Sequence, residues 1–369
     1  MADTLIDLSH RIHGAPELKF EEHRSSAWTA GALSDAGLAV ETAICDLPTA
    51  FSCRIGSGPL HLAICAEYDA LPGIGHACGH NIIAAAAVGA GLALAPVVDD
   101  LGLTVTVIGT PAEEGGGGKQ ILMDRGAFAG VHGAMMVHPT PREDLYPRVS
   151  ATAIMRVAYE GRAAHAALAP HLGINAADAM TVAQVAIGLL RQHLRPGELV
   201  HGIVSDGGEA PNVVPSHTEG TWMARAPRIE DLGGLRPRVH HCFEAGALAT
   251  GATVTITPES PDYAHMVHDH GIGEVFRANA RDCGRPESDD GEATFSTDMG
   301  NVSLTIPSIH PCLAIDTGGA VNHQPGFTEA AVNPSADRAV REGALAMAWT
   351  AIDLAAGPLR DRLLSGVGR

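Results

Sequence analysis

Two short segments of the sequence concentrate the side chain types that bind metal ions. A glycine-containing loop carries His76, Cys78 and His80 at alternate positions, so the three side chains can face the same way in an extended loop. The pair Glu113-Glu114 stands directly before four glycines, and two adjacent carboxylates are costly to place together unless a cation neutralises them. Thiolate, imidazole and carboxylate are the donors of a zinc- or manganese-type site. These segments therefore predict a metal centre.

Both segments also have a purely structural interpretation. The His-x-Cys-x-His loop fits a buried cysteine beside two hydrogen-bonded histidines, and the glutamate pair fits a solvated acidic loop. The order along the chain favours the metal site. Asp69, the glutamate pair and His138 each follow the end of a predicted strand. In open α/β sheets, ligands bind at the carboxyl ends of the strands.

The elements that must position these residues alternate between strand and helix. Apolar and β-branched runs at 61–65, 103–108 and 133–137 predict strands, whereas residues 17–37 and the alanine-rich segment after Asn81 predict helices. This alternation predicts an α/β domain with a mostly parallel sheet. The same texture returns late in the chain, with strands expected near 302–306 and 312–315 and a final helix over Ser335–Leu354.

The middle of the chain has a different texture. Strands are expected over Ala151–Tyr159, within 200–226 and over 252–257, and a long helix over Asn175–Leu194. A β-α-β-β-α-β order makes a small α+β domain with an antiparallel sheet. We therefore expect a discontinuous first domain, residues 1–150 and 262–369, interrupted by an inserted domain, residues 151–261.

Composition excludes several classes of protein. The 369 residues carry a net charge of −18, which argues against a nucleic-acid partner. No apolar run reaches the ~18 residues of a membrane span, and the first residues do not resemble a signal peptide. We therefore expect a cytoplasmic protein without a membrane partner. The seven scattered cysteines, with no Cys-x-x-Cys pair, argue against a disulfide framework.

Two other catalytic motifs fail on their residues. A phosphate-binding loop ending in Gly118-Lys119 would need glycine where Glu113 stands and serine or threonine where Gln120 stands. The Gly-x-Ser-x-Gly turn of serine hydrolases is absent from the sequence. An anion-binding module and a serine hydrolase are therefore disfavoured.

Longer motifs make the metal-site interpretation more specific. The segments His13–Leu18, Ala66–Asn81 and Gly109–Lys119 resemble the M20 family of metallopeptidases and amidohydrolases. Within it they resemble the branch of aminobenzoyl-glutamate hydrolases, amino-acid-conjugate hydrolases and aminoacylase-1-like dipeptidases. Four further segments resemble the same family, the first two of them its dimerisation or lid domain: Gly161–Ala166, Asn212–Pro215, Ser296–Gly300 and Asn322–Phe327.

The resemblance implies a zinc-peptidase-like catalytic domain with two divalent ions per chain, most simply Zn²⁺, with Mn²⁺, Co²⁺ or Ni²⁺ as alternatives. Cys78 would bridge the ions, and the remaining ligands would be His80, Glu114, His138 and His323. Glu113 would be the general base, Asp69 would orient a ligand, and His76 would lie behind the ligands.

The resemblance also implies roles for the inserted domain, which would be a ferredoxin-like dimerisation or lid domain. His165 would reach the active site of the partner in a homodimer, and would stabilise the oxyanion there. Asn212 and Arg225 would hold polar groups or a carboxylate of the substrate. Each active site would then combine residues of two chains.

The function favoured on these grounds is hydrolysis of the amide bond of an N-acyl or aroyl amino acid, or of a small conjugate. Divalent ions would activate the water and Glu113 would carry its proton. A dipeptidase is the alternative within the same chemistry. A non-catalytic metal-binding protein on the same fold is the alternative outside it, and Glu113, which is not needed as a ligand, argues against that alternative.

Two residues depart from the patterns of the wider family. Asn81 stands where many relatives have aspartate, although the dipeptidase-like branch shares this asparagine. Glu67 stands where the peptidase branches place a metal-binding histidine. The cysteine-containing form of the site is therefore the template, and neither departure removes an expected ligand.

Overall fold

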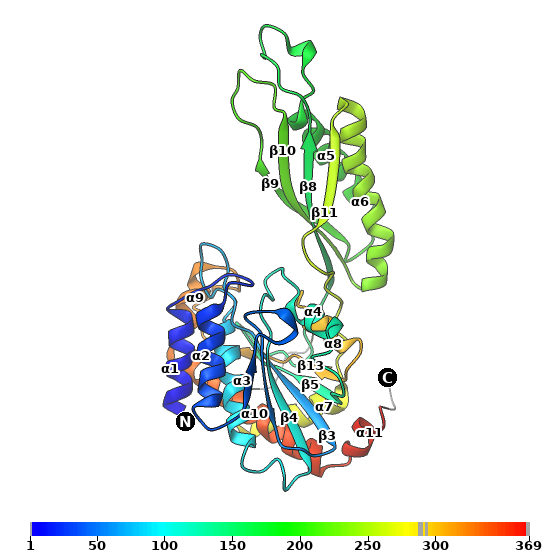
Figure 1. The fold of residues 1–369 in the computed structure, drawn as a ribbon. Helices are drawn as coiled ribbons and strands as arrows, with labels where there is room; N and C mark the ends of the chain where they lie inside the picture. Colours follow the sequence, from blue (N-terminus) through cyan, green and yellow to red (C-terminus); the bar gives the residue numbers. More distant parts are fainter. Residues whose placement is uncertain (1, 287–290, 292–293, 367–369) are drawn as a thin grey trace. The chain divides into compact units, whose positions relative to one another are not determined.

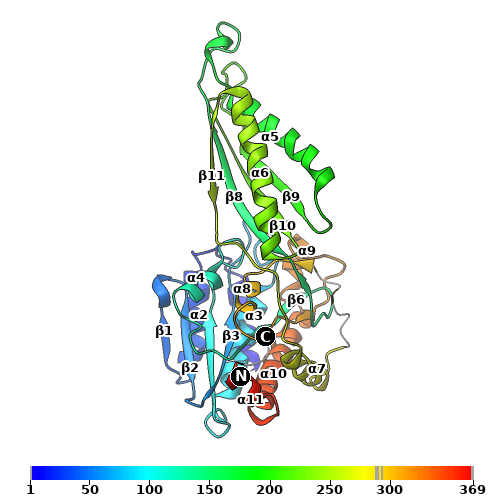
Figure 2. The same cartoon turned by 90° about the vertical axis from the view of Figure 1, so that its right-hand side faces the viewer.

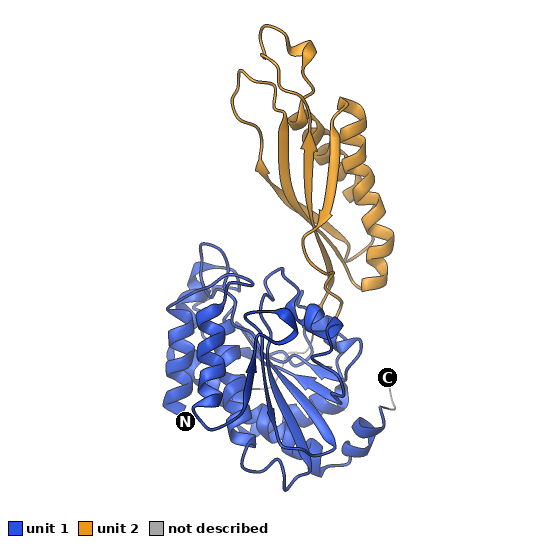
Figure 3. Cartoon of the chain, viewed as in Figure 1, with its two compact units in different colours: residues 1–148, 266–369 blue, residues 149–265 orange. Residues whose placement is uncertain are grey.

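The computed structural model describes residues 2–286, 291 and 294–366. Its contacts divide the chain into two compact units (Figure 3). Unit 1 comprises residues 1–148 and 266–369, and unit 2 comprises residues 149–265. These limits lie close to the boundaries expected at residues 151 and 261. Each unit has its own hydrophobic core.

Unit 1 is built on a six-stranded mixed sheet, seen in Figures 1 and 2, in the order β1-β2-β4-β3-β5-β13. Four neighbouring strands, β4, β3, β5 and β13, are parallel, and β1 and β2 are antiparallel to their neighbours. The expected mostly parallel sheet is therefore confirmed. The strands are β1 (Val40–Thr42), β2 (Phe51–Ile55), β3 (Leu60–Ala66), β4 (Leu103–Gly109), β5 (Gly133–Met135) and β13 (Ser308–Ile309).

The alanine-rich segment forms helix α3 (His80–Leu94), which is buried on almost every face. It packs against β3 and β4 on one side and against α1 and α10 on the other. A side chain at Gly89 would clash with Leu5 and Ala344, so small residues permit this close packing. The other helices of unit 1 are α1 (Ala2–His13), α2 (His23–Ser34), α4 (Gly118–Asp124), α7 (His270–Asp282), α8 (Met299–Ser303), α9 (Pro325–Ala330), α10 (Pro334–Ala356) and α11 (Arg360–Ser365).

Short elements complete unit 1. Strand β14 (Cys312–Ala314) pairs in parallel with β6 (His138–Thr140). The strand expected at 312–315 is therefore present. The remaining pieces are β12 (Thr294–Phe295), a 3₁₀ turn (Ile44–Asp46) and β7 (Arg148–Val149), where the chain leaves the unit. No helix among the described residues combines the length and the apolar character that crossing a bilayer requires.

Two expected elements of unit 1 were wrong in detail. The helix expected over 17–37 begins only at His23, because the Glu17 carboxylate accepts hydrogen bonds from the backbone amides of Arg24 and Ser25 and caps the helix from upstream. The strand expected at 302–306 is instead helix α8 and a helical turn, in which the amide of Ile306 donates to the carbonyl of Val302. The strand there is two residues further on, at β13.

The carboxyl ends of three parallel strands coincide at one edge of the sheet. Ala66 at the end of β3 lies beside Gly109 at the end of β4, and Ile64 lies beside Met135 at the end of β5. The segments that carry Asp69, Glu113 and His138 leave the sheet from these ends. The sheet register alone therefore brings three distant parts of the sequence together.

Unit 2 has the expected β-α-β-β-α-β order. Its antiparallel sheet runs β11-β8-β10-β9 and packs against two helices. Asn175 caps the first helix by accepting hydrogen bonds from the amides of Ala177 and Asp178. The elements are β8 (Ala151–Glu160), α5 (Ala176–Leu190), β9 (Leu199–Asp206), β10 (His217–Ala226), α6 (Ile229–Thr250), β11 (Thr253–Pro258) and the 3₁₀ turns Pro170–Leu172 and Arg191–His193.

Candidate metal centre

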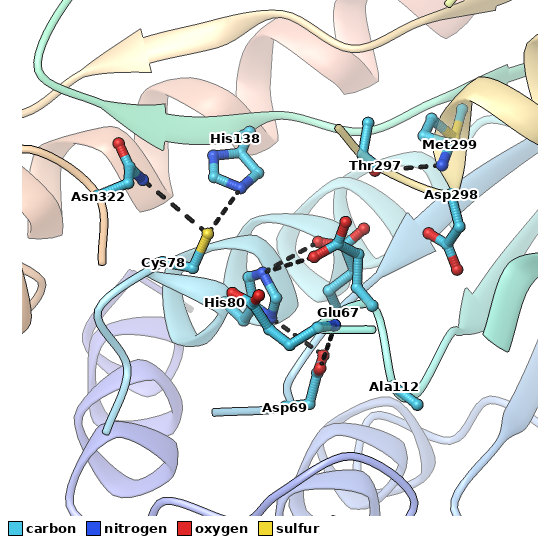
Figure 4. Close-up of polar contacts among 12 residues, drawn as sticks. Glu67, Asp69, Cys78, His80, Ala112, His138, Thr297, Asp298, Met299 and Asn322 are labelled. Carbon is cyan, nitrogen blue, oxygen red and sulfur yellow. Dashed lines mark hydrogen bonds and ion pairs between the residues drawn. The ribbon is translucent and has the colours of Figure 1, made fainter. Parts of the chain in front are cut away.

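The five side chains expected as metal ligands gather around the sulfur of Cys78. Figure 4 shows three of them, Cys78, His80 and His138. The donor atoms of Cys78, His80 and His138 lie within 4.8 Å of one another, and so do those of Cys78, Glu114 and His323. Cys78 belongs to both groups. A thiolate shared between two sets of donors is suited to bridge two cations.

The spacing of the donor atoms matches that of ligands around a common ion. The Cys78 Sγ lies 3.4 Å from the His138 Nε2, and the Glu114 Oε1 lies 3.4 Å from the His323 Nε2. Two ligands with bonds of about 2.0–2.3 Å and a tetrahedral angle between them are roughly 3.3–3.6 Å apart. Both pairs are thus separated as two ligands of one ion are, although 3.4 Å is also the length of a hydrogen bond to sulfur in the Cys78–His138 pair.

Backbone conformations of low population occur where the chain enters the site. Ala112 (φ +61°) and His323 (φ +68°) adopt the left-handed region without being glycine. Such strained residues cluster at functional sites. Gly79 (φ +76°) precedes His80, and a Cβ there would lie 2.5 Å from the Pro139 side chain. Glycine is therefore required where the Cys78 loop turns into helix α3.

Asp69 joins two of the converging segments. Its Oδ1 accepts from the His80 Nδ1 (3.0 Å), and its Oδ2 accepts from the backbone amide of Glu114 (2.8 Å). Burial raises the pKa of Asp69, but the His80 ring, the Glu114 amide and Lys119 together outweigh burial and lower this pKa overall. The carboxylate thus turns the His80 Nε2 toward the cluster and holds the glutamate loop in place.

The second buried histidine is oriented by the backbone. The His138 Nδ1 donates to the carbonyl of Pro139 (2.9 Å), so its Nε2 faces Cys78. Burial lowers the pKa of His138 to about 4. The ring is therefore neutral near pH 7, the form in which imidazole binds a metal.

The negative charge of the cluster exceeds what its neighbours compensate. Burial, with the Glu114 carboxylate beside it, raises the pKa of Cys78 well above its usual value. Burial and the carboxylates of Glu67 and Glu114 raise the pKa of Glu113 in the same way. The buried His80 Nε2 and Glu114 Oε1 have no hydrogen-bond partner. A divalent cation would favour the ionised forms of Cys78 and Glu113 that burial disfavours, and it would give the unpartnered nitrogen and oxygen a partner, so this set of sulfur, nitrogen and oxygen atoms fits divalent cations.

A buried ion-pair network adjoins the cluster, and sequence reasoning did not identify it. Lys119 is fully buried and its Nζ contacts Glu67 and, at 2.6 Å, the Asp298 Oδ1. The backbone amide of Lys119 donates to the other Asp298 oxygen. Two features of the sequence could have pointed to this network. One is the Gly118-Lys119 pair, which was considered only as part of a phosphate-binding loop, and the other is the segment Ser296–Gly300, which contains Asp298.

Another residue that was missed is His310, which directly follows β13. Its ring is fully buried, both ring nitrogens lack hydrogen-bond partners, and its centroid lies 5.3 Å from that of His138. The rule that polar residues after parallel strands point to the site also applies to this residue. It was not applied because the strand was expected several residues earlier.

Two other residues of the Cys78 loop region lie outside the groups of donor atoms. His76 is buried, its ring nitrogens have no hydrogen-bond partner, and its ring lies 6.2 Å from that of His13. Asn81 donates to the Ser9 hydroxyl and to the carbonyl of Ala331, so it ties α3 to its neighbours. Asparagine at this position therefore has a structural explanation.

The residues expected to act from the inserted domain all lie in unit 2. His165 and Asn212 are exposed and adjacent, since the amide of Ala166 donates to the carbonyl of Asn212. Arg225 lies near the far end of β10, where it donates to the Thr152 hydroxyl and to His201. Eight residues of strand, about 27 Å, separate Arg225 from the start of β10 that follows the Asn212 loop. Within one chain, His165 is thus grouped with Asn212 but not with Arg225.

Comparison with known proteins places this geometry in context. The model of peptidase family M20/M25/M40 matches residues 63–341. The Xaa-Arg dipeptidase of Mus musculus is 38% identical over 99% of this chain and 88% of its own length. One of the subunits of the p-aminobenzoyl-glutamate hydrolase of Escherichia coli is 35% identical over 67% of this chain and 56% of its own length. A dinuclear metal-binding M20 peptidase from Bacillus subtilis shares the fold, with a TM-score of 0.71 at 19% identity over 96% of this chain and 98% of that chain.

The Lys119 network predicts a large loss of stability when its cation is removed. Lys119→Met leaves the buried carboxylates of Glu67 and Asp298 uncompensated, which is expected to reduce the free energy of unfolding by about 3–5 kcal/mol. Urea denaturation of the chelator-treated chain measures this change. Lys19→Met is the matched control, because Lys19 is exposed and contacts one carbonyl. Equal stability of the two variants would contradict the electrostatic role given to Lys119.

Proposed function

The chain belongs to peptidase family M20/M25/M40 and is an enzyme acting on amide or peptide bonds, and from this premise we propose that it hydrolyses the amide bond that precedes a terminal amino acid. The products are a carboxylic acid and a free amino acid, with one water consumed. Both N-acyl or aroyl amino acids and dipeptides contain this bond.

A single observation carries the proposal: five potential ligands and a separate carboxylate converge on one edge of the sheet. Cys78 is common to two groups of donors, while Glu113 lies close enough to reach the same space. The Glu113 Oε2 is 3.8 Å from the His80 Nε2, and its side chain is buried. A carboxylate beside the ligands, and not needed among them, is placed to move protons.

Each residue of the site then has a distinct role in amide hydrolysis. Divalent ions bound by Cys78 and its neighbours would supply Lewis acidity toward the carbonyl and the attacking water. Glu113 takes a proton from that water and returns it to the leaving nitrogen. Asp69 keeps His80 oriented during the reaction. His165, contributed by the partner chain, stabilises the charge that develops on the carbonyl oxygen.

The extent of the match to two relatives bears on the class of substrate. The Xaa-Arg dipeptidase matches nearly the whole of this chain, whereas the aminobenzoyl-glutamate hydrolase matches about two thirds of it. This difference favours the dipeptidase alternative, with a basic C-terminal residue, over the acyl or aroyl conjugates. Arg225 and Asn212 are the proposed partners of the substrate's polar groups and carboxylate.

We also propose that the chain forms a homodimer through unit 2. Strand β9 is an edge strand of that unit's sheet, and the side chains of Leu199 and Ile203 on it are more than half exposed. Val185 and Leu189 on α5 are exposed to a similar extent. An unpaired edge strand with apolar side chains is a template for pairing. Pairing about a two-fold axis satisfies both chains equally.

A substrate panel tests the function directly. We expect the metal-loaded chain to hydrolyse dipeptides ending in arginine or lysine faster than N-acetyl amino acids or aminobenzoyl-glutamate. Chelation should abolish the activity, and divalent metal should restore it. Liquid chromatography of the released amino acid measures the rates. Turnover of none of these amides by the metal-loaded chain would contradict the proposal.

The matched control for that panel is Glu113→Gln. This variant should keep its metal and its fold and lose roughly 10²–10⁴-fold in kcat, the usual contribution of general-base catalysis. If Glu113→Gln lost its metal while Glu114→Gln retained it, Glu113 would be the metal ligand and Glu114 the general base, contrary to the proposal.

Subunit mixing tests the shared active site. His165→Ala and Glu113→Gln should each be inactive alone, because each removes a group from both sites of its homodimer. A mixed dimer assembles one intact site, so random exchange should restore about a quarter of the wild-type activity.

The control mixes Glu113→Gln with Glu114→Gln, whose changes lie in the same unit and cannot complement each other. Confirmed subunit exchange without recovery in the first mixture would place His165 outside the partner's active site.

A further inference from the structure

The carboxylate of Glu67 directly follows β3 and is fully buried beside the cluster. One of its oxygens, Oε1, is held by the Lys119 Nζ. The other, Oε2, has no hydrogen-bond partner and lies 3.4 Å from the His80 Nε2. That nitrogen also has no hydrogen-bond partner, and its side chain is fully buried as well. Two unsatisfied buried polar atoms therefore face each other.

Leaving such a pair unsatisfied is unfavourable, since each buried group without a partner costs about 1–3 kcal/mol. The His80 Nδ1 is held by the Asp69 carboxylate, so the Nε2 is the ring nitrogen that would bind an ion, and it faces Glu67. The Glu67 Oε2 is likewise the carboxylate oxygen that Lys119 leaves available. The two atoms are separated by the distance expected for two ligands of one ion, roughly 3.3–3.6 Å.

We propose that Glu67 is a further metal ligand, whose Oε2 binds the same ion as the His80 Nε2. This inference rests on the proposed function, because it concerns the ions of the same site. The donor atoms of Glu67, His80 and Glu113 also lie within 4.8 Å of one another, as the other two groups do.

The Lys119 network explains how a carboxylate can serve at this position. Lys119 holds one oxygen of Glu67. The carboxylate of Asp298 in turn accepts hydrogen bonds from both the side-chain Nζ and the backbone amide of Lys119. Hydrogen bonds to a ligating carboxylate fix its orientation. The network therefore leaves one oxygen of Glu67 directed at His80 and prevents it from turning away.

With Glu67 as a ligand, the two ions differ in their donors. Glu67 would be the carboxylate donor of the ion near His80 and His138, whereas Glu114 would be that of the ion near His323, and the sulfur of Cys78 is common to both groups. Loss of Glu67 should therefore weaken one ion and spare the other.

The test measures metal binding to Glu67→Gln at equilibrium. Wild-type protein and variant are stripped of metal and then titrated with Co²⁺ in a buffered free-metal series. Bound metal is measured by mass spectrometry, and the cobalt spectrum reports the thiolate ligand. We expect one of the two sites to weaken by more than the roughly 10–100-fold that follows loss of an outer-sphere partner. The other site should keep its affinity and its thiolate-to-cobalt absorption.

The matched control is Glu143→Gln. Glu143 is likewise a buried glutamate that pairs with a cation, Arg285, at 2.6 Å, but it belongs to none of the donor groups. This variant should be destabilised without any change in metal affinity. If Glu67→Gln does not fold, Glu67→Asp serves instead, because it keeps a counter-charge for Lys119 while withdrawing the oxygen from His80.

The possible outcomes separate this inference from the proposed function. Unchanged affinity at both sites in the Glu67 variant, with reduced stability alone, would show that Glu67 only balances Lys119 and would overturn the inference. Absence of Co²⁺ binding to the wild-type chain would overturn the proposed function itself. Selective loss of one ion supports both.

Discussion

The structure of unit 1 is organised around an excess of buried negative charge at one edge of its sheet. Glu67, Asp69, Glu113 and Asp298 are all buried there, and the thiol of Cys78 lies beside them. Charges of one sign are not stable together in a low-dielectric interior unless cations compensate them. Lys119 supplies part of that compensation from within the chain. The remainder is the physical reason for which we propose that the site binds divalent ions.

The parallel strands bring the donors together, and Asp69 then fixes their relative positions. One carboxylate holds both the ring of His80 and the backbone of Glu114, so it links the Cys78 loop to the glutamate loop. The left-handed backbone at Ala112 and His323 shows that the ligand loops are not in their most relaxed conformations. Such strain persists when surrounding contacts determine it, as is common at functional sites.

Much of this site could be predicted from the sequence, because polar residues after parallel strands meet at the same edge. That rule identified Asp69, the glutamate pair and His138. It applies equally to Glu67, which follows the strand expected at 61–65, and it would have identified His310 with a correct strand assignment. The role of Lys119 could not be predicted, because a single buried lysine has no local sequence pattern and its partners Glu67 and Asp298 are distant in sequence. Helix α8 was expected as a strand because short apolar runs do not distinguish the two structures. The separation of Arg225 from Asn212 follows from the length of β10, whose start at His217 was not distinguished within the strands expected over 200–226.

The central claim is that the site is built for two ions with Cys78 between them. The most direct measurement is anomalous diffraction at the zinc absorption edge, from crystals of the metal-loaded chain. The account predicts two anomalous peaks per chain, about 3.5–4 Å apart, with the Cys78 sulfur bonded to both ions. A single peak, or peaks elsewhere in the chain, would contradict it.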